Sequence, residues 1–382
     1  IKRHFAAAAA EIGLATAPGR GTVGEEGVGP YRITTRRGLR CSAADAFLRP
    51  ALRRRNLALR TGAAVERIDF EGRRAAGVTY RRGRSVCRVR ARRGVLLAAG
   101  AIKSPQLLQL SGIGPGARLA EHGIEVLHAN PAVGGGLQDH LGVDYLFRAT
   151  EPTLNQSLGT LMGRLRAALA FLWSRSGPLS LSVNQMGGMV RSSPERARAD
   201  MQLYFNPLSY TSQPRGRRVL LRPDPWPGFA IGFNACRPTS RGRVDIATAD
   251  PAAAPEIAPN YLSTNEDVAE IVTGGRLIER MLGTDALRVL VAGPNGFGPG
   301  GASDEALIAD FRARATSVFH ACGTCRMAPE AEGGVVDHRL RVHGVEGLRV
   351  VDASIFPNIT SANTNAPTLM VAEMAATQIL AD

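Results

Sequence analysis

The sequence predicts an α/β fold with two lobes, one of them interrupted in sequence by the other. At 382 residues the chain is long enough for more than one domain. A continuous apolar run, 94–100, ends on glycine and precedes helical spacing over 102–110, an order typical of a Rossmann-like parallel sheet covered by helices. From about 146 to 310 the pattern changes to short strands, helices and proline-rich joints. This change predicts an inserted α+β lobe built on an antiparallel sheet.

The elements expected before the insertion follow from local patterning. An alanine-rich stretch that ends at Gly13 predicts a helix. Two strands with alternating apolar residues flank the turn Arg82-Gly83. In chain order the expected elements are a helix at 4–13, strands at 57–61, 63–70, 75–80, 85–89 and 94–100, and a helix at 102–110.

Within and after the insertion, the strongest patterns are two strands and two helices. The strands 229–233 and 243–247 flank a turn-rich link and are expected to join one antiparallel sheet that forms a wall of a pocket. Amphipathic spacing predicts a helix at 267–282. The apolar helix expected at 369–380 is preceded by Asn365-Ala-Pro367-Thr368, with proline where a first turn tolerates it.

Charge and hydropathy limit the partners and the location. The net charge is +14, but 45 of the 47 basic residues are arginines scattered along the chain, so nucleic-acid binding is not expected. An anionic substrate or contact with a membrane surface stays open. No apolar run approaches the length of a transmembrane helix, and no signal peptide precedes the fold, so a cytoplasmic location is expected, with membrane association as the alternative.

Two short motifs invite a cofactor or metal interpretation and are set aside. The string Gly19-Arg-Gly-Thr-Val-Gly24 fits the dinucleotide pattern, but neither a buried strand precedes it nor a helix follows it. Cys322-Gly-Thr-Cys325 has no second cysteine or histidine pair nearby to complete a zinc site. We therefore expect no metal, and we interpret these cysteines as small residues packed near His320.

The densest chemistry lies near the C-terminus. His320 stands in the run Val318-Phe-His-Ala-Cys-Gly-Thr-Cys-Arg-Met327, and Asn363 follows 43 residues later. Imidazole suits a general base near neutral pH, and an amide can donate to an oxygen that develops negative charge. The structural alternative for Asn363 is a turn or cap residue before the last helix, with Asn365 as the substitute if the register differs.

Several blocks in a fixed order resemble the glucose-methanol-choline (GMC) oxidoreductases, flavoenzymes that take a hydride from an alcohol. The segment Gly100-Ala-Ile-Lys-Ser104-Pro-Gln-Leu-Leu-Gln-Leu-Ser-Gly-Ile-Gly114 resembles a signature pattern of that family. The other blocks are Tyr31-Arg-Ile-Thr34, Gly38-Leu-Arg-Cys-Ser42, Asn56-Leu57, Val133-Gly-Gly-Gly-Leu-Gln-Asp-His140, Arg237-Pro-Thr-Ser-Arg-Gly-Arg-Val244 and the C-terminal run. The resemblance thus extends along the whole chain. It implies oxidation of a small-molecule alcohol to an aldehyde or ketone, with FAD as cofactor and oxygen or a quinone as electron acceptor.

The resemblance also implies roles for individual residues. His320 falls at the position of the family's catalytic histidine, and Asn363 at that of its second active-site residue. The implied flavin contacts are Val65, Gly100, Ser104, Asp352, Ala353, Asn365, Pro367 and Thr368. His140 closes a block that looks structural or cofactor-adjacent rather than catalytic. The implied lobes are 1–145 and 311–382 for FAD, with 146–310 for substrate.

One departure from the family pattern is large. The βαβ unit with the flavin-pyrophosphate fingerprint, expected at the start of a family member, is not found after Ile1. The chain therefore resembles such an enzyme without its N-terminal portion. Two alternatives follow: a non-catalytic or incomplete fragment that cannot bind FAD alone, and a lyase that uses the same fold.

Overall fold

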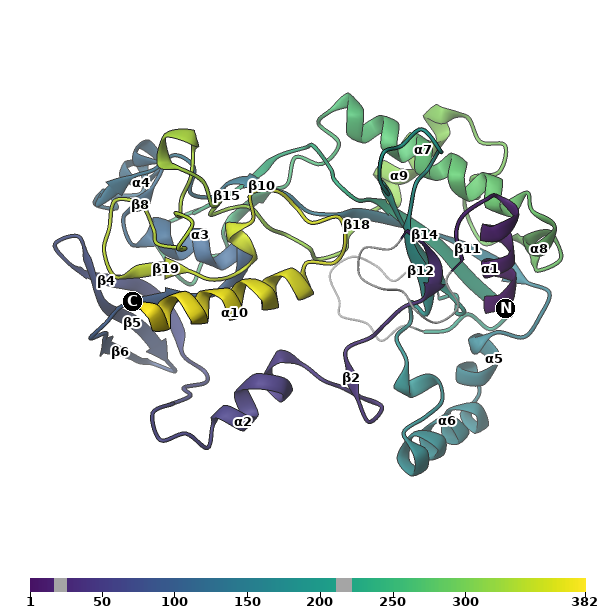
Figure 1. Cartoon of the computed structure of the whole chain (residues 1–382), viewed down its shortest axis with the longest axis horizontal. Coiled ribbons are helices and arrows are strands. Elements are labelled where there is room, and N and C mark those ends of the chain that lie inside the picture. The colour runs from purple at the N-terminus through teal and green to yellow at the C-terminus, as the bar shows by residue number, and fades with distance from the viewer. Residues whose placement is uncertain (17–25, 211–221) are drawn as a thin grey trace. The chain divides into compact units, whose positions relative to one another are not determined.

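The computed structural model describes residues 1–16, 26–210 and 222–382, which form two compact units (Figure 1). Unit 1 comprises Ile1–Leu59, Leu141–Cys236 and Val268–Thr316. Unit 2 comprises Arg60–His140, Arg237–Asp267 and Ser317–Asp382. The glycine string 19–24 lies outside the described residues.

Unit 1 is built on a large antiparallel sheet. Its strand order is β1-β12-β13-β14-β11-β17. The bounds in that order are Gly27–Pro30, Met186–Val190, Met201–Asn206, Gly228–Ala235, Leu141–Ala149 and Val291–Pro294. Strand β13 is buried along its whole length, as expected for a central strand covered on both faces. The inserted segment thus contains the expected antiparallel sheet.

Aromatic side chains fix helices to one face of this sheet. Phe5 of α1 (Lys2–Glu11) stacks on Phe205 of β13 with ring centroids 4.7 Å apart. Phe311 of α9 (Asp304–Arg314) lies 5.8 Å from Phe233 of β14. In α7 (Asn265–Leu282), a Cβ on Gly274 would come within 2.0 Å of the Phe233 ring, so glycine permits this close approach. The other elements in this part of the chain are β2 (Thr35–Arg36), β3 (Leu39–Arg40), the π-helix Ala44–Leu48, α2 (Arg49–Ala51), α5 (Leu154–Gly159), α6 (Leu161–Ser174), the 3₁₀ turn Pro178–Ser180, α8 (Asp285–Arg288) and β18 (Thr316–Ser317).

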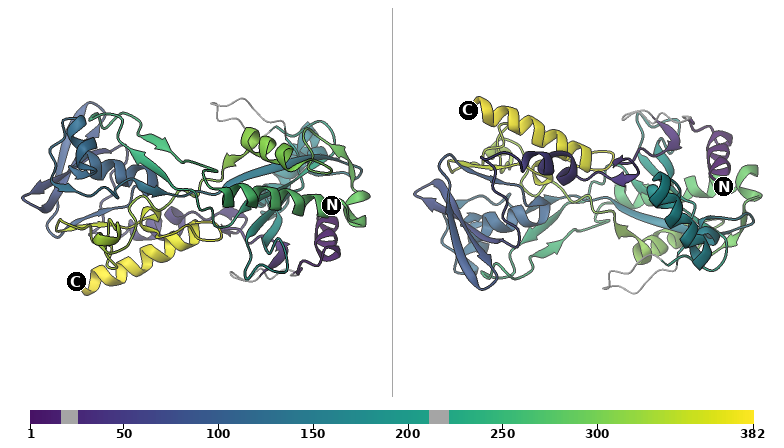
Figure 2. Two further views of the ribbon diagram at one scale, coloured as in Figure 1. Left: turned by 90° about the horizontal axis from the view of Figure 1, so that it is seen from above. Right: turned by 90° about the horizontal axis from the view of Figure 1, so that it is seen from below.

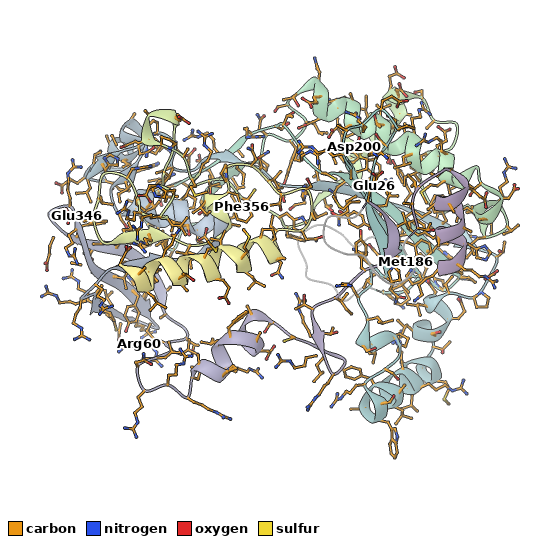
Figure 3. All side chains as sticks on the ribbon, in the orientation of Figure 1. Glu26, Arg60, Met186, Asp200, Glu346 and Phe356 are labelled. Atoms are coloured by element: carbon orange, nitrogen blue, oxygen red, sulfur yellow. The ribbon has the colours of Figure 1, made fainter. Side chains whose placement is uncertain are left out.

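Unit 2 combines small sheets with three helices around a hydrophobic core. The parallel pair is β7 (Val95–Leu97) with β19 (Leu348–Val350). The remaining strands are β4 (Ala64–Glu71), β5 (Arg74–Arg82) and β6 (Ser85–Arg90) in one sheet, β10 (Gly135–Leu137), β15 (Gly242–Asp245) and β16 (Glu256–Ala258) in another, and the pair β8 (Ile113–Gly114) with β9 (His128–Ala129). The helices are α3 (Gly100–Leu110), α4 (Gly116–Glu121) and α10 (Asn365–Ala381), and short 3₁₀ turns occur at Glu330–Glu332 and Ala353–Ile355. Phe356, labelled in Figure 3, belongs to the core, which also includes Leu108 and Val350.

Helix α10 runs along the surface of unit 2 in both views of Figure 2. It is apolar along most of its length, yet Ala375 is its only buried residue, whereas Met370, Met374 and Leu380 are exposed. None of the helices in the described ranges has both the length and the apolar character needed to cross a bilayer.

Helix α3 contains a proline whose effect is compensated by a side chain. The helix expected at 102–110 begins two residues earlier, because α3 begins at Gly100, and Pro105 lies inside it. Proline has no N–H for the carbonyl four residues earlier, that of Ala101. The buried Thr324 hydroxyl donates to this carbonyl at 2.6 Å. This hydrogen bond connects Thr324, four residues after His320, to the first turn of α3.

Three other expectations differ from the structure. Residues 57–61 form no strand, although 64–71 do. Strands β14 and β15 do not share a sheet, because β14 pairs with β11 and β13 in unit 1 whereas β15 pairs with β10 and β16 in unit 2. The run at β7 is not buried throughout: Leu97 is buried but Leu96 is 54% exposed, since successive side chains in a strand point to opposite faces.

The units also divide the chain at points other than the expected lobe boundaries. Residues 1–59 group with the large sheet, because β1 pairs with β12 and α1 packs on β13. Their assignment by function to an FAD lobe or a substrate lobe stays a prediction.

Candidate active site

His320 is held by a carboxylate that organises the turn before it. The His320 backbone N–H donates to Asp139 Oδ1 at 2.8 Å. Asp139 Oδ2 accepts hydrogen bonds from the hydroxyls of Ser317 and Tyr261. Phe319, between Ser317 and His320, has φ +64, a left-handed conformation that is uncommon for a bulky residue. This strained residue is stabilised by the bonds around it, and it places the His320 side chain in the interior, 9% exposed.

Two side chains contact the two ring nitrogens of His320. His140, fully buried, lies with its Nδ1 2.9 Å from His320 Nδ1. Asn363 lies with its Nδ2 2.9 Å from His320 Nε2. Because an amide nitrogen only donates, His320 Nε2 is the acceptor and carries a lone pair rather than a proton. The proton of neutral His320 therefore sits on Nδ1 and is donated to His140 Nδ1.

The surroundings of His320 favour the neutral ring. Burial lowers the pKa of His320 below its usual value, and the negative charge of Asp139 opposes this effect only in part. The imidazole is therefore neutral at physiological pH, with its Nε2 lone pair available. This is the protonation state that a general base requires.

Asp352 forms a second polar cluster with the start of α3. Its carboxylate accepts from Gly100 N at 2.9 Å, from Ser104 Oγ at 2.5 Å and from Ser354 N at 2.8 Å. Gly100 has φ +81, a conformation that favours glycine, and a Cβ there would meet nothing within 4 Å. The backbone at Gly100 thus faces open space. Ala353 joins the cluster through its carbonyl, which accepts from Gly323 N at 3.2 Å.

The start of α10 follows Asn363 directly. Its N-cap residue, Thr364, makes no side-chain cap hydrogen bond. The Thr368 hydroxyl instead donates to the Thr364 carbonyl at 2.7 Å, and Pro367 has no N–H. The backbone N–H groups of Asn365 and Ala366 are therefore available at the positive end of the helix dipole.

Most of the predicted site residues thus fall into three groups in unit 2. His320 contacts Asn363, whereas Asn365 opens α10. Gly100, Ser104, Asp352 and Ala353 gather at the start of α3, and Asn365, Pro367 and Thr368 open α10. Val65 stands apart: it lies in β4 opposite Tyr80, is 40% exposed, and among the described residues has no hydrogen bond to these groups.

Two residues at this site were not identified from the sequence in these roles. Asp139 and His140 end the Leu137-Gln-Asp-His140 block, for which the sequence predicts a structural or cofactor-adjacent role. In the structure Asp139 binds the His320 backbone and His140 contacts its ring. The sequence signal that could have identified them is the adjacent pair of ionisable side chains, a carboxylate followed by an imidazole. Pairing them with a residue 180 positions away requires the tertiary fold.

The two cysteines after His320 lie in the interior of unit 2. Cys322 and Cys325 are buried and free of disulfide bonds. Burial raises the pKa of Cys322 to about 12 and also raises that of Cys325. Both thiols are therefore protonated at neutral pH, which disfavours redox or metal chemistry.

Unit 1 contains polar groups on the sheet face opposite α1, α7 and α9. Three buried oxygens there have no hydrogen-bond partner among the described residues: the Tyr204 hydroxyl, Asn206 Oδ1 and Asn234 Oδ1. The neighbouring Asp144 accepts from the Tyr210 hydroxyl at 3.1 Å, and burial raises the pKa of this carboxyl. Buried polar atoms without partners are uncommon, so this face is a candidate ligand surface.

Comparisons with known proteins cover most of the chain. Residues 1–142 and 238–372 match the N- and C-terminal family models described as GMC oxidoreductase. The alcohol dehydrogenase [acceptor] of Pseudomonas putida is 38% identical over 357 residues, covering 92% of this chain and 63% of that protein. The oxygen-dependent choline dehydrogenase of Brucella anthropi is also 38% identical, covering 93% and 64%. An uncharacterized GMC-type oxidoreductase of Mycobacterium bovis is 38% identical over 387 residues, covering 98% and 69%. This chain therefore spans under two thirds of the length of the first two relatives.

Two solved structures of flavoenzymes or oxidases match nearly the whole chain. Pyridoxine 4-oxidase from Mesorbium loti matches with a TM-score of 0.83 and 28% identity, covering all of this chain and 69% of that one. An FAD-dependent oxidoreductase from Chaetomium thermophilum matches with a TM-score of 0.87 and 25% identity, covering 99% and 71%.

Proposed function

Because the chain belongs to the GMC oxidoreductase family, we propose that it carries the proton-accepting site of an enzyme that oxidises an alcohol to an aldehyde or ketone with FAD. The proposal rests on the contact of 2.9 Å between His320 Nε2 and Asn363 Nδ2, in which the amide donates to the ring nitrogen. Relatives named alcohol dehydrogenase and choline dehydrogenase support the reaction class.

The residues present fit a flavin ring. The start of α10 offers backbone N–H groups without a side-chain cap, which suits an electron-rich ring edge. Gly100 presents its backbone to open space, as a close approach of a planar ring requires. We propose that Asn365, Pro367 and Thr368 lie at the ring edge, while Asp352 with Ala353 and Ser104 fixes the Gly100 backbone. When bound, FAD supplies the acceptor for the hydride from the carbinol carbon.

His320 and Asn363 together bind the substrate hydroxyl group and accept its proton. An alcohol hydroxyl that replaces their direct contact would direct its proton to His320 Nε2, and its oxygen would accept from Asn363 Nδ2. The base removes the proton as the carbon loses its hydride, and the amide stabilises the developing charge on oxygen. His140 accepts from His320 Nδ1, which keeps the reactive lone pair on Nε2 and favours the charged ring after proton transfer.

The pH dependence of the reaction follows from the burial of His320. Because its pKa is lowered, the base stays neutral as the pH falls below the usual histidine value of about 6.5. We expect kcat/KM to hold at pH 6.5 and to decline only at lower pH. The same group makes the protein lose stability as pH falls from about 6.5 through the folded pKa, because the unfolded chain takes up the proton first. An acid limb centred above pH 6.5 would contradict this assignment.

Truncating Asn363 should lower the rate without unfolding the protein. Asn363→Ala removes a donor to the substrate oxygen, for which a loss of roughly 10²-fold in kcat/KM is expected. The side chain is exposed, so the thermal midpoint should change little. Asn358→Ala is the matched control, because its exposed amide oxygen accepts a hydrogen bond from Arg241 at 2.9 Å and is not part of the proposed site, and full activity is expected for it. Equal kinetics of the two variants would refute the role of Asn363.

The substrate and the electron acceptor remain at the level of chemical class. We propose a small-molecule alcohol and either oxygen or a quinone, and the sequence-based expectation of a cytoplasmic location stays a prediction.

A visible absorbance spectrum of the purified chain tests cofactor binding. Flavin bands would favour the enzyme, whereas their absence would favour the incomplete fragment. The lyase alternative predicts product formation while a bound flavin stays oxidised.

A further inference from the structure

Helix α6 is a well-formed helix in unit 1 whose apolar side chains point into solvent. The Thr160 hydroxyl caps its start by accepting from Gly163 N, and Arg175 ends it in a left-handed conformation with φ +53. Ala167 is the only buried residue among its 14. In Figure 1 it lies next to α5, at the end of unit 1 away from α7. Figure 3 shows side chains of α6 projecting away from the rest of unit 1.

The exposed side chains of α6 form one continuous face. Leu161, Leu165, Leu169 and Leu172 recur at intervals of four, four and three residues, which aligns them along one side of a helix. Met162 and Trp173 extend this side. All six are between 51% and 95% exposed, and Trp173 is the most exposed. A contiguous apolar face of this kind marks a surface of interaction, unlike single apolar residues scattered over a surface.

Positive charge surrounds the apolar face. Arg164, Arg166 and Arg175 lie in or beside α6, and no aspartate or glutamate occurs from 152 to 194. Arg164 donates to the carbonyl of Leu158 at 2.7 Å, and Arg175 lies over the Phe171 ring. Among the described residues no carboxylate forms an ion pair with these three arginines. Their charge is therefore available to a partner.

We propose that α6 binds in the plane of an anionic membrane surface. Its leucines, methionine and tryptophan would enter the interface between headgroups and acyl chains, and its arginines would contact lipid phosphates. At about 1.5 Å per residue, 14 residues extend roughly 21 Å, short of the ~30 Å hydrocarbon core, so the helix lies on the bilayer and does not cross it. A twofold contact with a second copy is disfavoured, because it would bring the same arginines of both copies together.

Trp173 provides a direct probe, because Trp173 and Trp226 are the only tryptophans. In the full chain carrying Trp226→Phe, adding vesicles of phosphatidylcholine with phosphatidylglycerol should shift the emission to shorter wavelength. Vesicles of phosphatidylcholine alone should have a much smaller effect. An unchanged spectrum with the anionic vesicles would overturn the proposal.

Sedimentation with the same vesicles tests the residues. Leu165→Glu with Leu169→Glu should reduce the bound fraction at least tenfold, and Arg166→Gln should weaken binding roughly fivefold. Val86→Glu, an exposed valine on β6, is the matched control and should bind like the wild type. Binding unaffected by the double substitution would refute the assignment to α6. A concentration-dependent dimer, lost in the double variant and without vesicle binding, would instead identify a second copy as the partner. None of these outcomes depends on catalysis.

Discussion

Replacing His320 by alanine should lower the rate at which an alcohol reduces the flavin by roughly 10²- to 10⁴-fold, the usual contribution of a positioned base. The variant retains the Asp139 contact to the backbone of residue 320, so the fold should persist. Stopped-flow absorbance under anaerobic conditions, with a flavin-loaded, full-length enzyme, measures this rate.

The control and the pH profile separate a catalytic role from a structural one. His338→Ala removes an exposed histidine and should leave the rate unchanged. The residual activity of His320→Ala should lose the acid limb that the wild type shows below pH 6.5. An undiminished rate, or a retained acid limb, would show that His320 is not the base.

The largest stability effect is expected at Asp352. Asp352→Ala removes the acceptor for Gly100 N, Ser104 Oγ and Ser354 N in a site where Asp352 is 5% exposed. Each buried donor left without an acceptor costs about 1–3 kcal/mol, so a loss of ~3 kcal/mol or more is expected. Denaturant unfolding followed by circular dichroism measures it.

Asp245→Ala is the matched control for this measurement. Asp245 forms an ion pair with Arg243 in which the two side chains are 19% and 47% exposed, and a loss below about 1 kcal/mol is expected. The role of Asp352 in holding the start of α3 would be refuted if both variants unfolded at the same denaturant concentration. A destabilised Asp352→Ala that still bound flavin normally would confine that role to folding.

Local sequence patterns predict an element when its apolar residues recur with the period of a helix or strand and turn residues mark its ends. Strands β5 and β6 and helices α7 and α10 follow from residue periodicity and turn residues. The segment 57–61 alternates in the same way but forms no strand, since a strand requires a hydrogen-bonded neighbour. The pairing of β15 with β10 and β16, rather than with β14, likewise depends on contacts distant in sequence.

At the site, the sequence indicated residue types and order but not every contact. His320 and Asn363 were identified by resemblance to a family pattern, and the fold then brings them within 2.9 Å. His140 and Asp139 were missed because a pairing across some 180 residues leaves no local pattern. The exposure of the apolar face of α6 also could not be predicted, because amphipathic spacing alone does not say which side of a helix is buried.

In the proposed reaction, His320 takes the hydroxyl proton of the alcohol and bound FAD accepts its hydride. The most direct measurement is anaerobic mixing of the flavin-loaded, full-length enzyme with an alcohol, with absorbance and carbonyl product followed together. We expect the flavin to bleach without oxygen, one aldehyde or ketone to form per flavin, and deuterium on the carbinol carbon to slow the bleaching. Carbonyl product formed while the flavin stays oxidised would contradict the proposed reaction.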